Sequence, residues 1–158
     1  MNVNVRSALR LGVVLLAVTV GSMAGARAEE SEAKAGQLHF SARDIKDSYG
    51  FSCSGVVVAS PVLPAGPFAQ VGQVTCDGID TCEGTATGSF NGLILSLELT
   101  GTYTVNSNGT GFVLYDLTIG GAPAGQLPIA FVVTDKGRGI KGLPTTPGFA
   151  ITCDLKSQ

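Results

Sequence analysis

The sequence predicts an all-β domain: an eight-stranded antiparallel up-and-down barrel closed by a disulfide bond. Three observations lead to this prediction. Short runs of alternating apolar and polar residues recur along the chain, glycine, proline and asparagine separate them, and Cys53 and Cys153 lie near the two ends of the pattern. If these cysteines pair, the first and last strands lie side by side and the sheet closes on itself. A two-sheet β-sandwich is the alternative.

The first 28 residues have the features of a cleaved signal peptide. Arg6 and Arg10 precede an uncharged apolar run of ten residues, Leu11–Val20, and Ala26 and Ala28 place small residues where a signal peptidase cleaves. As a helix this run spans about 15 Å, half of a ~30 Å hydrocarbon core, so we expect no retained membrane span. The sequence therefore predicts export, to the periplasm or the extracellular space.

Removal of this peptide leaves a polar leader, residues 29–36, which we expect to be disordered, and one barrel domain, residues 37–158. The remaining chain keeps seven basic and all twelve acidic residues, a net charge of −5. Nucleic acids and anionic membranes require a basic surface, which such a chain lacks. We therefore expect neither as a partner, and the sequence leaves the oligomeric state open.

The strands can be located in order along the chain. Period-two alternation is clearest over Leu93–Val105, where apolar residues alternate with Ser, Glu and Thr. Asn108-Gly109 then favours a tight hairpin into a second run, Thr110–Ile119. The other six strands are expected at Leu38–Arg43, Tyr49–Val57, Phe68–Cys76, Glu83–Phe90, Leu127–Thr134 and Phe149–Leu155.

Residues that break strands mark the connections between these runs. Pro61, Pro64 and Pro67 predict a loop, because a strand interior does not tolerate this spacing of prolines. The segments Gly120–Gly125 and Lys136–Gly142 are rich in glycine and are predicted to be turns. Short turns between successive strands are typical of an up-and-down barrel.

The four cysteines allow three disulfide pairings. The simplest joins Cys76 to Cys82 across a short turn and Cys53 to Cys153 across the domain. A zinc site is the alternative, but the chain has no CxxC spacing and a single histidine, His39, so we expect neither a metal nor another cofactor. Asp77 and Asp80, inside the short cysteine loop, resemble a calcium loop only in part, since the run of oxygen ligands is missing.

Glu98 and Asp116 are the candidate catalytic residues. The hairpin between their strands predicts that Glu98 lies opposite Leu117, one step from Asp116, and a one-residue bulge would make the two carboxylates neighbours. Two close carboxylates raise the pKa of one of them and can act as an acid–base pair. The simpler interpretation is that both face water, as strand carboxylates usually do.

Tyr49, Tyr103 and Tyr115 all fall on predicted inward faces and are the candidate ligand-binding residues. A buried tyrosine needs a hydrogen-bond partner for its hydroxyl. The three side chains therefore either line a cavity and give it a few polar points, or pack in an ordinary core with their hydroxyls at the barrel rim.

At Gly88–Gly92 (GSFNG), Gly101–Gly111 (GTYTVNSNGTG) and Phe131–Lys136 (FVVTDK) the chain resembles a group of small exported bacterial proteins with a barrel of the calycin or allene-oxide-cyclase-like type. The resemblance covers about residues 47–155. It implies an eight-stranded barrel with an apolar interior, in a class whose members bind or cyclise lipophilic small molecules. No catalytic residue of those enzymes matches a position of this sequence.

Three functions follow as hypotheses. The first is a barrel that binds a small apolar molecule in its interior, since eight strands leave room for side chains or one small ligand. The second is a cyclase or isomerase that uses Glu98 or Asp116 as its acid. The third is a structural or protein-interaction module with a packed core. Fold analogy does not choose among them.

Overall fold

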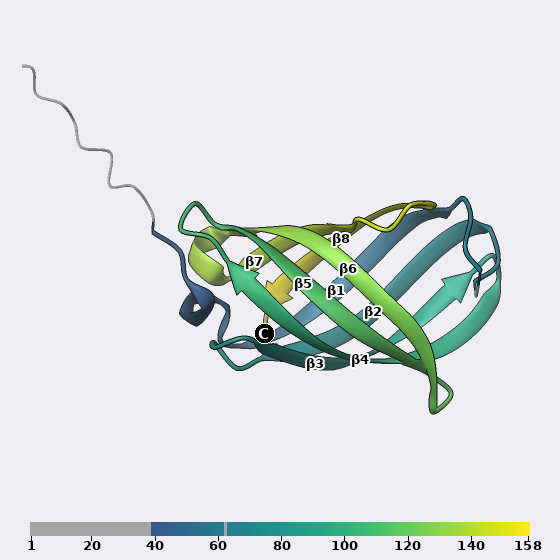
Figure 1. Cartoon of the computed structure of the whole chain (residues 1–158), viewed down its shortest axis with the longest axis horizontal. Helices are drawn as coiled ribbons and strands as arrows, with labels where there is room; N and C mark the ends of the chain where they lie inside the picture. Colours follow the sequence, from purple (N-terminus) through teal and green to yellow (C-terminus); the bar gives the residue numbers. More distant parts are fainter. Residues whose placement is uncertain (1–38, 62) are drawn as a thin grey trace, which may run out of the picture. The chain divides into compact units, whose positions relative to one another are not determined.

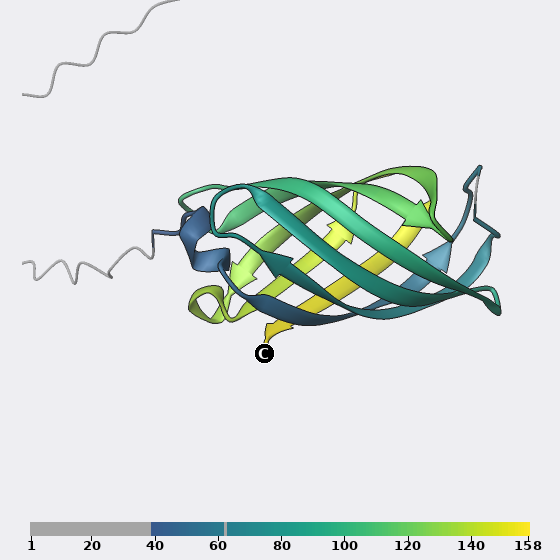
Figure 2. The same cartoon turned by 90° about the horizontal axis from the view of Figure 1, so that it is seen from below.

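The computed structural model describes residues 39–61 and 63–158, which form a closed barrel of eight antiparallel strands (Figures 1 and 2). The predicted barrel is thus confirmed over the sandwich. The expected signal peptide and the leader lie outside the described residues. The strands are β1 (Ser48–Val57), β2 (Gly66–Cys76), β3 (Thr81–Phe90), β4 (Leu93–Val105), β5 (Thr110–Ile119), β6 (Ala122–Thr134), β7 (Gly139–Pro144) and β8 (Phe149–Ser157).

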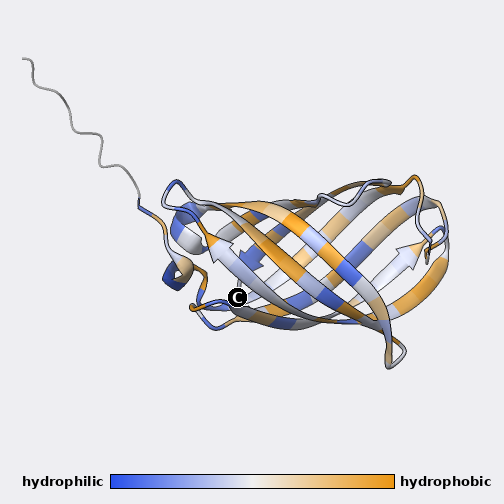
Figure 3. Cartoon of the chain, viewed as in Figure 1, coloured by the Kyte–Doolittle hydropathy of each residue, from blue (hydrophilic) through white to orange (hydrophobic). Residues whose placement is uncertain are grey.

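Alternation along each strand decides which side chains fill the barrel. In β4 the buried residues Leu97, Leu99 and Tyr103 alternate with exposed Glu98 and Thr102, as the period-two pattern predicts. Figure 3 shows the same alternation of apolar and polar positions along the strands. Burial of one apolar face per strand therefore fixes the register of the whole sheet.

The first and last strands pair and close the sheet. β1 and β8 are antiparallel neighbours from Tyr49↔Ser157 to Val57↔Phe149, and Cys53 lies directly opposite Cys153. These two cysteines form a disulfide with a Cα–Cα distance of 4.1 Å and a sequence separation of 100. The predicted closure through sulfur is confirmed.

The second predicted disulfide is also present. Cys76 and Cys82 are opposite residues at the ends of β2 and β3 and are bonded to each other across the short loop between these strands. The described part of the chain has no free cysteine. The thiolate zinc site considered from the sequence is therefore excluded.

The expected strand at Leu38–Arg43 is wrong in its described part. Ala42–Ile45 forms a short 3₁₀ helix, η1, instead. The Asp44 carboxylate accepts hydrogen bonds from the backbone N–H and the hydroxyl of Ser41, and the Asp44 N–H donates to the Ser41 carbonyl oxygen. These local bonds favour a helical turn over a strand at this position.

Two of the expected turns are shorter than the sequence predicts. Gly139–Pro144 forms β7 rather than part of a Lys136–Gly142 turn, because its backbone pairs with β6 and β8 on both sides. The turn itself is η2 (Asp135–Gly137). Likewise β6 begins at Ala122, and the glycine-rich stretch after β5 is absorbed by a register shift between Leu117 and Thr118. The number of strands is as predicted, but β7 takes the place of the expected first strand.

The up-and-down order places the connections at two ends, which we call the floor and the mouth. The floor holds η1, η2, the β2–β3 loop and the β4–β5 turn, and η1 contacts β4 and η2 there. The mouth holds the β1–β2 and β7–β8 loops and the β3–β4 and β5–β6 turns. In Figure 1 the two helical turns lie together at one end of the barrel and the β1–β2 loop lies at the other. Within the described ranges, no helix is long and apolar enough to cross a membrane.

The two disulfides should differ in how much they stabilise the barrel. By loop-closure entropy, a crosslink over 100 residues contributes about 4.7 kcal/mol and one over six residues about 2 kcal/mol. We expect the Cys53→Ala/Cys153→Ala variant to lose about twice as much free energy of unfolding in urea as Cys76→Ala/Cys82→Ala. Equal losses would contradict the dependence of the stabilisation on the length of the closed loop.

Candidate functional site

The barrel encloses an apolar cavity of about 420 Å³. Inward-facing residues of all eight strands line it, and aliphatic and aromatic side chains dominate the lining. Many inward positions are glycine, which adds no side-chain volume. These glycines are Gly55, Gly72, Gly84, Gly88, Gly101, Gly111 and Gly142. Aromatic rings lie over several of these glycines, and of this set only Gly142 lines the cavity.

The cavity is closed at the floor. Ile45 of η1, 2% exposed, belongs to its lining. The backbone N–H of Phe40 donates to the Ser107 carbonyl oxygen in the β4–β5 turn and so ties the segment before η1 to the barrel. Gly137 lies against η1, where a Cβ atom would collide with the Asp44 carbonyl oxygen, and it adopts a φ of +94°. A side chain at Gly137 would therefore push η1 off the floor.

The cavity reaches the surface at the mouth. Pro61 of the β1–β2 loop and Gly125 and Gln126 of β6 are exposed and also line the cavity. Leu63, from the same loop as Pro61, is 9% exposed and faces the cavity, and its backbone N–H donates to the Ser60 hydroxyl at 3.1 Å. An apolar molecule can thus enter between these loops without crossing the sheet.

The lining carries no formal charge. Among the described residues that face the cavity there is no Asp, Glu, Lys, Arg or His. The polar side chains of the lining are Ser60, Gln70, Tyr103, Tyr115, Gln126 and Thr146. Because an unpaired charge in such surroundings is costly, this cavity suits a neutral molecule with a large apolar surface.

The three predicted tyrosines are all buried, but they have different roles. The Tyr49 hydroxyl donates to the Gly137 carbonyl oxygen at 2.7 Å and the Tyr103 hydroxyl donates to the Ala42 carbonyl oxygen at 3.3 Å. Both bonds join a strand to a helical turn at the floor. Tyr49 is not part of the cavity lining, whereas Tyr103 contributes its ring.

Tyr115 is the tyrosine whose hydroxyl faces the cavity. Its side chain is 8% exposed and lines the cavity, and its ring lies over Gly101 on β4, where a Cβ atom would come within 2.7 Å of the ring. The Tyr115 hydroxyl has no hydrogen-bond partner among the described residues, yet no fully enclosed side-chain oxygen or nitrogen there lacks one. The hydroxyl oxygen must therefore be open to the cavity space. Burial raises the pKa of Tyr115 to about 12, so the hydroxyl keeps its proton and can donate.

Glu98 and Asp116 lie outside the cavity. Both are exposed on the outer face of the barrel, where Glu98 is opposite Thr118 and Asp116 is opposite Thr100. The two residues share a face, as expected, but are diagonal neighbours and not an opposed pair. The Asp116 carboxylate accepts a hydrogen bond from the Gln126 side chain at 3.0 Å. Neither carboxylate can reach a molecule held in the barrel from this face.

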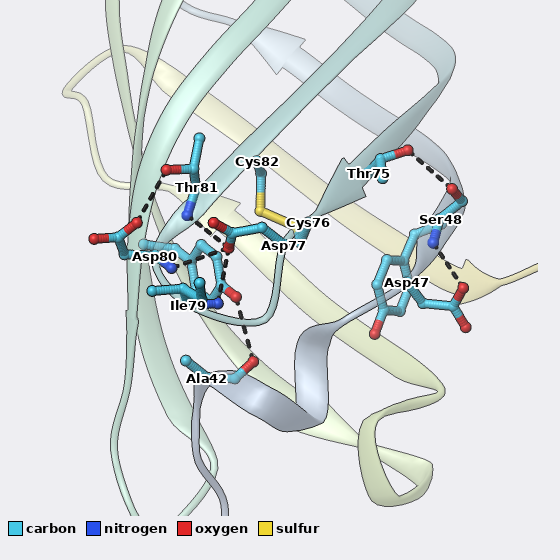
Figure 4. The surroundings of a disulfide bond; sticks show 12 residues. Ala42, Asp47, Ser48, Thr75, Cys76, Asp77, Ile79, Asp80, Thr81 and Cys82 are labelled. Atoms are coloured by element: carbon cyan, nitrogen blue, oxygen red, sulfur yellow. Dashed lines mark hydrogen bonds between the residues drawn. A yellow bond between two sulfur atoms is a disulfide. The ribbon is translucent and has the colours of Figure 1, made fainter.

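Asp77 holds the short cysteine loop together through backbone bonds. One oxygen of its carboxylate accepts the N–H groups of Ile79, Asp80 and Thr81 at 2.8–3.0 Å (Figure 4). These bonds lower the pKa of Asp77. The carboxylate that suggested a calcium loop thus serves as the acceptor of a turn, and the described residues contain no cluster of metal-ligating side chains. His39 is exposed and precedes η1, away from the cavity lining.

Gln70 is a cavity residue that the sequence interpretation missed. It lies on β2 in phase with buried Phe68 and Val74, so its side chain faces inward, where it is half-buried and lines the cavity. Its amide makes no hydrogen bond with any other described side chain or backbone group. A polar residue in phase with an apolar face was the signal that could have identified it.

Comparison of the chain with protein-family models, with curated proteins and with solved structures finds no match. The site must therefore be interpreted from its own chemistry.

The buried tyrosines should make the protein sensitive to alkali. Burial raises the pKa of Tyr49 and of Tyr115 from 10.0 to about 12, and burial also raises the pKa of Tyr103. The hydroxyls ionise more easily in the unfolded chain, so their contribution to stability is complete below pH 10 and is lost as the pH rises towards 12.

We expect tyrosinate absorbance to rise well above pH 10 in the native protein and near pH 10 in urea. The free energy of unfolding should fall between the pH at which the tyrosines ionise in urea and the higher pH at which they ionise in the native protein. Since the chain has three tyrosines, Tyr115→Phe should remove about a third of the absorbance change. A native titration midpoint near 10 would contradict the burial of these hydroxyls.

Proposed function

We propose that the protein binds a small apolar molecule inside its barrel. The observation that carries this proposal is the uncharged cavity of about 420 Å³, which is closed at the floor and reaches the surface at the mouth. Its volume lies within the ~300–1,000 Å³ typical of small-molecule sites. At about 30 Å³ per water-sized group, it holds about 14 such groups. A packed interaction module would not retain a cavity of this size.

The chemistry of the lining favours binding over catalysis. The cyclase alternative relied on Glu98 or Asp116 as the acid, and both lie on the outer face. The hydroxyls of Tyr103 and Tyr115, the only ionisable lining groups among the described residues, have raised pKa values and stay protonated at neutral pH. The proposal of a calycin-like binding barrel, which came from the sequence resemblance, is consistent with such an interior.

Export to the periplasm or the extracellular space is part of the same proposal. It rests on the signal-peptide features of the first 28 residues and is supported by the two disulfide bonds, which persist in oxidising compartments. A barrel that shields an apolar molecule would there keep it in solution outside the cytoplasm. The acidic surface makes nucleic acid an unsuitable partner.

Reducing the cavity volume should weaken binding without changing the fold. Val113 is 6% exposed and lines the cavity on β5, whereas Val71 is 62% exposed on the outer face of β2. We expect the wild-type protein to retain an adduct in native mass spectra that is lost on denaturation, and decane or decanol to raise its melting temperature. Stabilisation should reach about 2.7 kcal/mol at a ligand concentration 100 times Kd.

In the same assays Val113→Phe should retain less adduct and gain less in melting temperature than the wild type, because the phenylalanine ring occupies part of the cavity, and Val71→Phe should behave as wild type. If Val113→Phe does not fold, Ile129→Phe, another lining residue on β6, replaces it. Binding that is unchanged by both interior substitutions would place the ligand elsewhere. No adduct and no shift with any apolar probe would instead favour the interaction module.

A further inference from the structure

The Tyr115 hydroxyl is a hydrogen-bonding group directed at an apolar cavity. It is the buried tyrosine hydroxyl that the barrel itself leaves without a partner, since Tyr49 and Tyr103 both donate to backbone carbonyl oxygens. An unmet hydrogen bond in apolar surroundings costs as much as the desolvation of the group. A phenylalanine would fill the same space over Gly101 without this cost. The hydroxyl therefore needs a partner that is not part of the described chain.

A second neutral group faces the same space. Gln70 projects inward from β2, three strands from β5 in the barrel order, and its amide is also unpaired among the described residues. An amide can both donate and accept, and a tyrosine hydroxyl can do the same. The cavity thus offers a ligand two neutral groups, and each can donate a hydrogen bond to a polar group of the ligand or accept one from it.

The charge of the lining restricts what that polar group can be. No cationic side chain among the described residues faces the cavity. A carboxylate or phosphate beside Tyr115 would lose its hydration without gaining an opposite charge, which is unfavourable. A hydroxyl or carbonyl group loses little, because one or two neutral hydrogen bonds replace those it made with water.

We propose that the ligand of the cavity is a neutral amphipathic molecule, a hydrocarbon body with one hydroxyl or carbonyl group that hydrogen-bonds to the Tyr115 hydroxyl and the Gln70 amide. This inference rests on the proposed function, because it describes the occupant of the same cavity. The cavity volume equals that of about 14 water molecules at ~30 Å³ each, which suits an occupant of medium chain length. Medium-chain alcohols and ketones, and terpenoid alcohols of similar size, belong to this class.

Four probes of one chain length separate the possibilities: decane, decanol, decanone and decanoate. Their dissociation constants are measured by calorimetry on the wild-type protein and on Tyr115→Phe. We expect Tyr115→Phe to weaken decanol and decanone about two- to tenfold, the range that one neutral hydrogen bond supplies. Decane should bind the variant as well as, or better than, the wild type. Gln70→Met should give the same pattern and serves as the second variant if Tyr115→Phe does not fold.

Tyr49→Phe is the matched control, since it also removes a buried tyrosine hydroxyl, but one bonded to Gly137 outside the lining. It should lower the melting temperature and leave the affinities for the four probes in the same ratio. If Tyr115→Phe and Gln70→Met change decanol and decane equally, the hydrogen-bonded polar group is refuted while apolar binding stands. If decanoate binds tightest and ignores both variants, the neutral ligand is refuted. If no probe binds the wild type, the proposed function fails as well.

Discussion

The pairing of β1 with β8 is the interaction on which the rest of this molecule depends. It turns an open sheet into a tube, and without it both strands would present unpaired backbone groups. The Cys53–Cys153 bond lies within this pairing and joins residues far apart in the sequence. Closure of the sheet also creates the interior of the barrel. Only when the sheet is closed do the inward faces of the strands enclose a volume.

The two ends of the tube are built from different chemistry. At the floor, tyrosine hydroxyls, helical turns and a short loop held by Asp77 satisfy one another through hydrogen bonds to backbone groups. At the mouth, the backbone N–H groups of Val58 and Ala59 donate to the Gly148 carbonyl oxygen and hold two loops together, and exposed residues line the opening. The floor therefore closes the tube, whereas at the mouth the cavity reaches the surface.

Alternation along the strands, together with the number and spacing of the cysteines, was enough to predict the barrel, both disulfides and the inward direction of the three tyrosines. It was not enough for segments whose structure depends on their surroundings. The Leu38–Arg43 segment alternates as a strand does, but Asp44 follows it and accepts bonds from Ser41 that start a helical turn. Gly139–Pro144 contains two glycines and a proline, and it forms a strand because β6 and β8 bond to it from both sides.

The candidate site likewise has features that the sequence pattern predicts and features that depend on the surrounding structure. The period-two pattern predicts that Tyr115 points inward. It does not predict that the Tyr115 hydroxyl lacks a partner, because that depends on which backbone carbonyl oxygens lie near each tyrosine hydroxyl. The pattern also places Glu98 and Asp116 on one face. Their diagonal relation follows instead from the register of the hairpin, and the turn Asn106–Gly109 sets this register one residue away from the expected pairing. Gln70 shows that a single polar residue on the apolar face of a strand can indicate a cavity residue, which the composition alone does not reveal.

The C-terminal residue, Gln158, lies at the floor, where its backbone N–H bonds to Ser48, and the described chain also begins there, at His39 (Figure 1). A tether attached to the carboxyl end would consequently leave the opposite rim unobstructed. Immobilised in this way on a sensor surface, the barrel would present its entrance to the flowing solution.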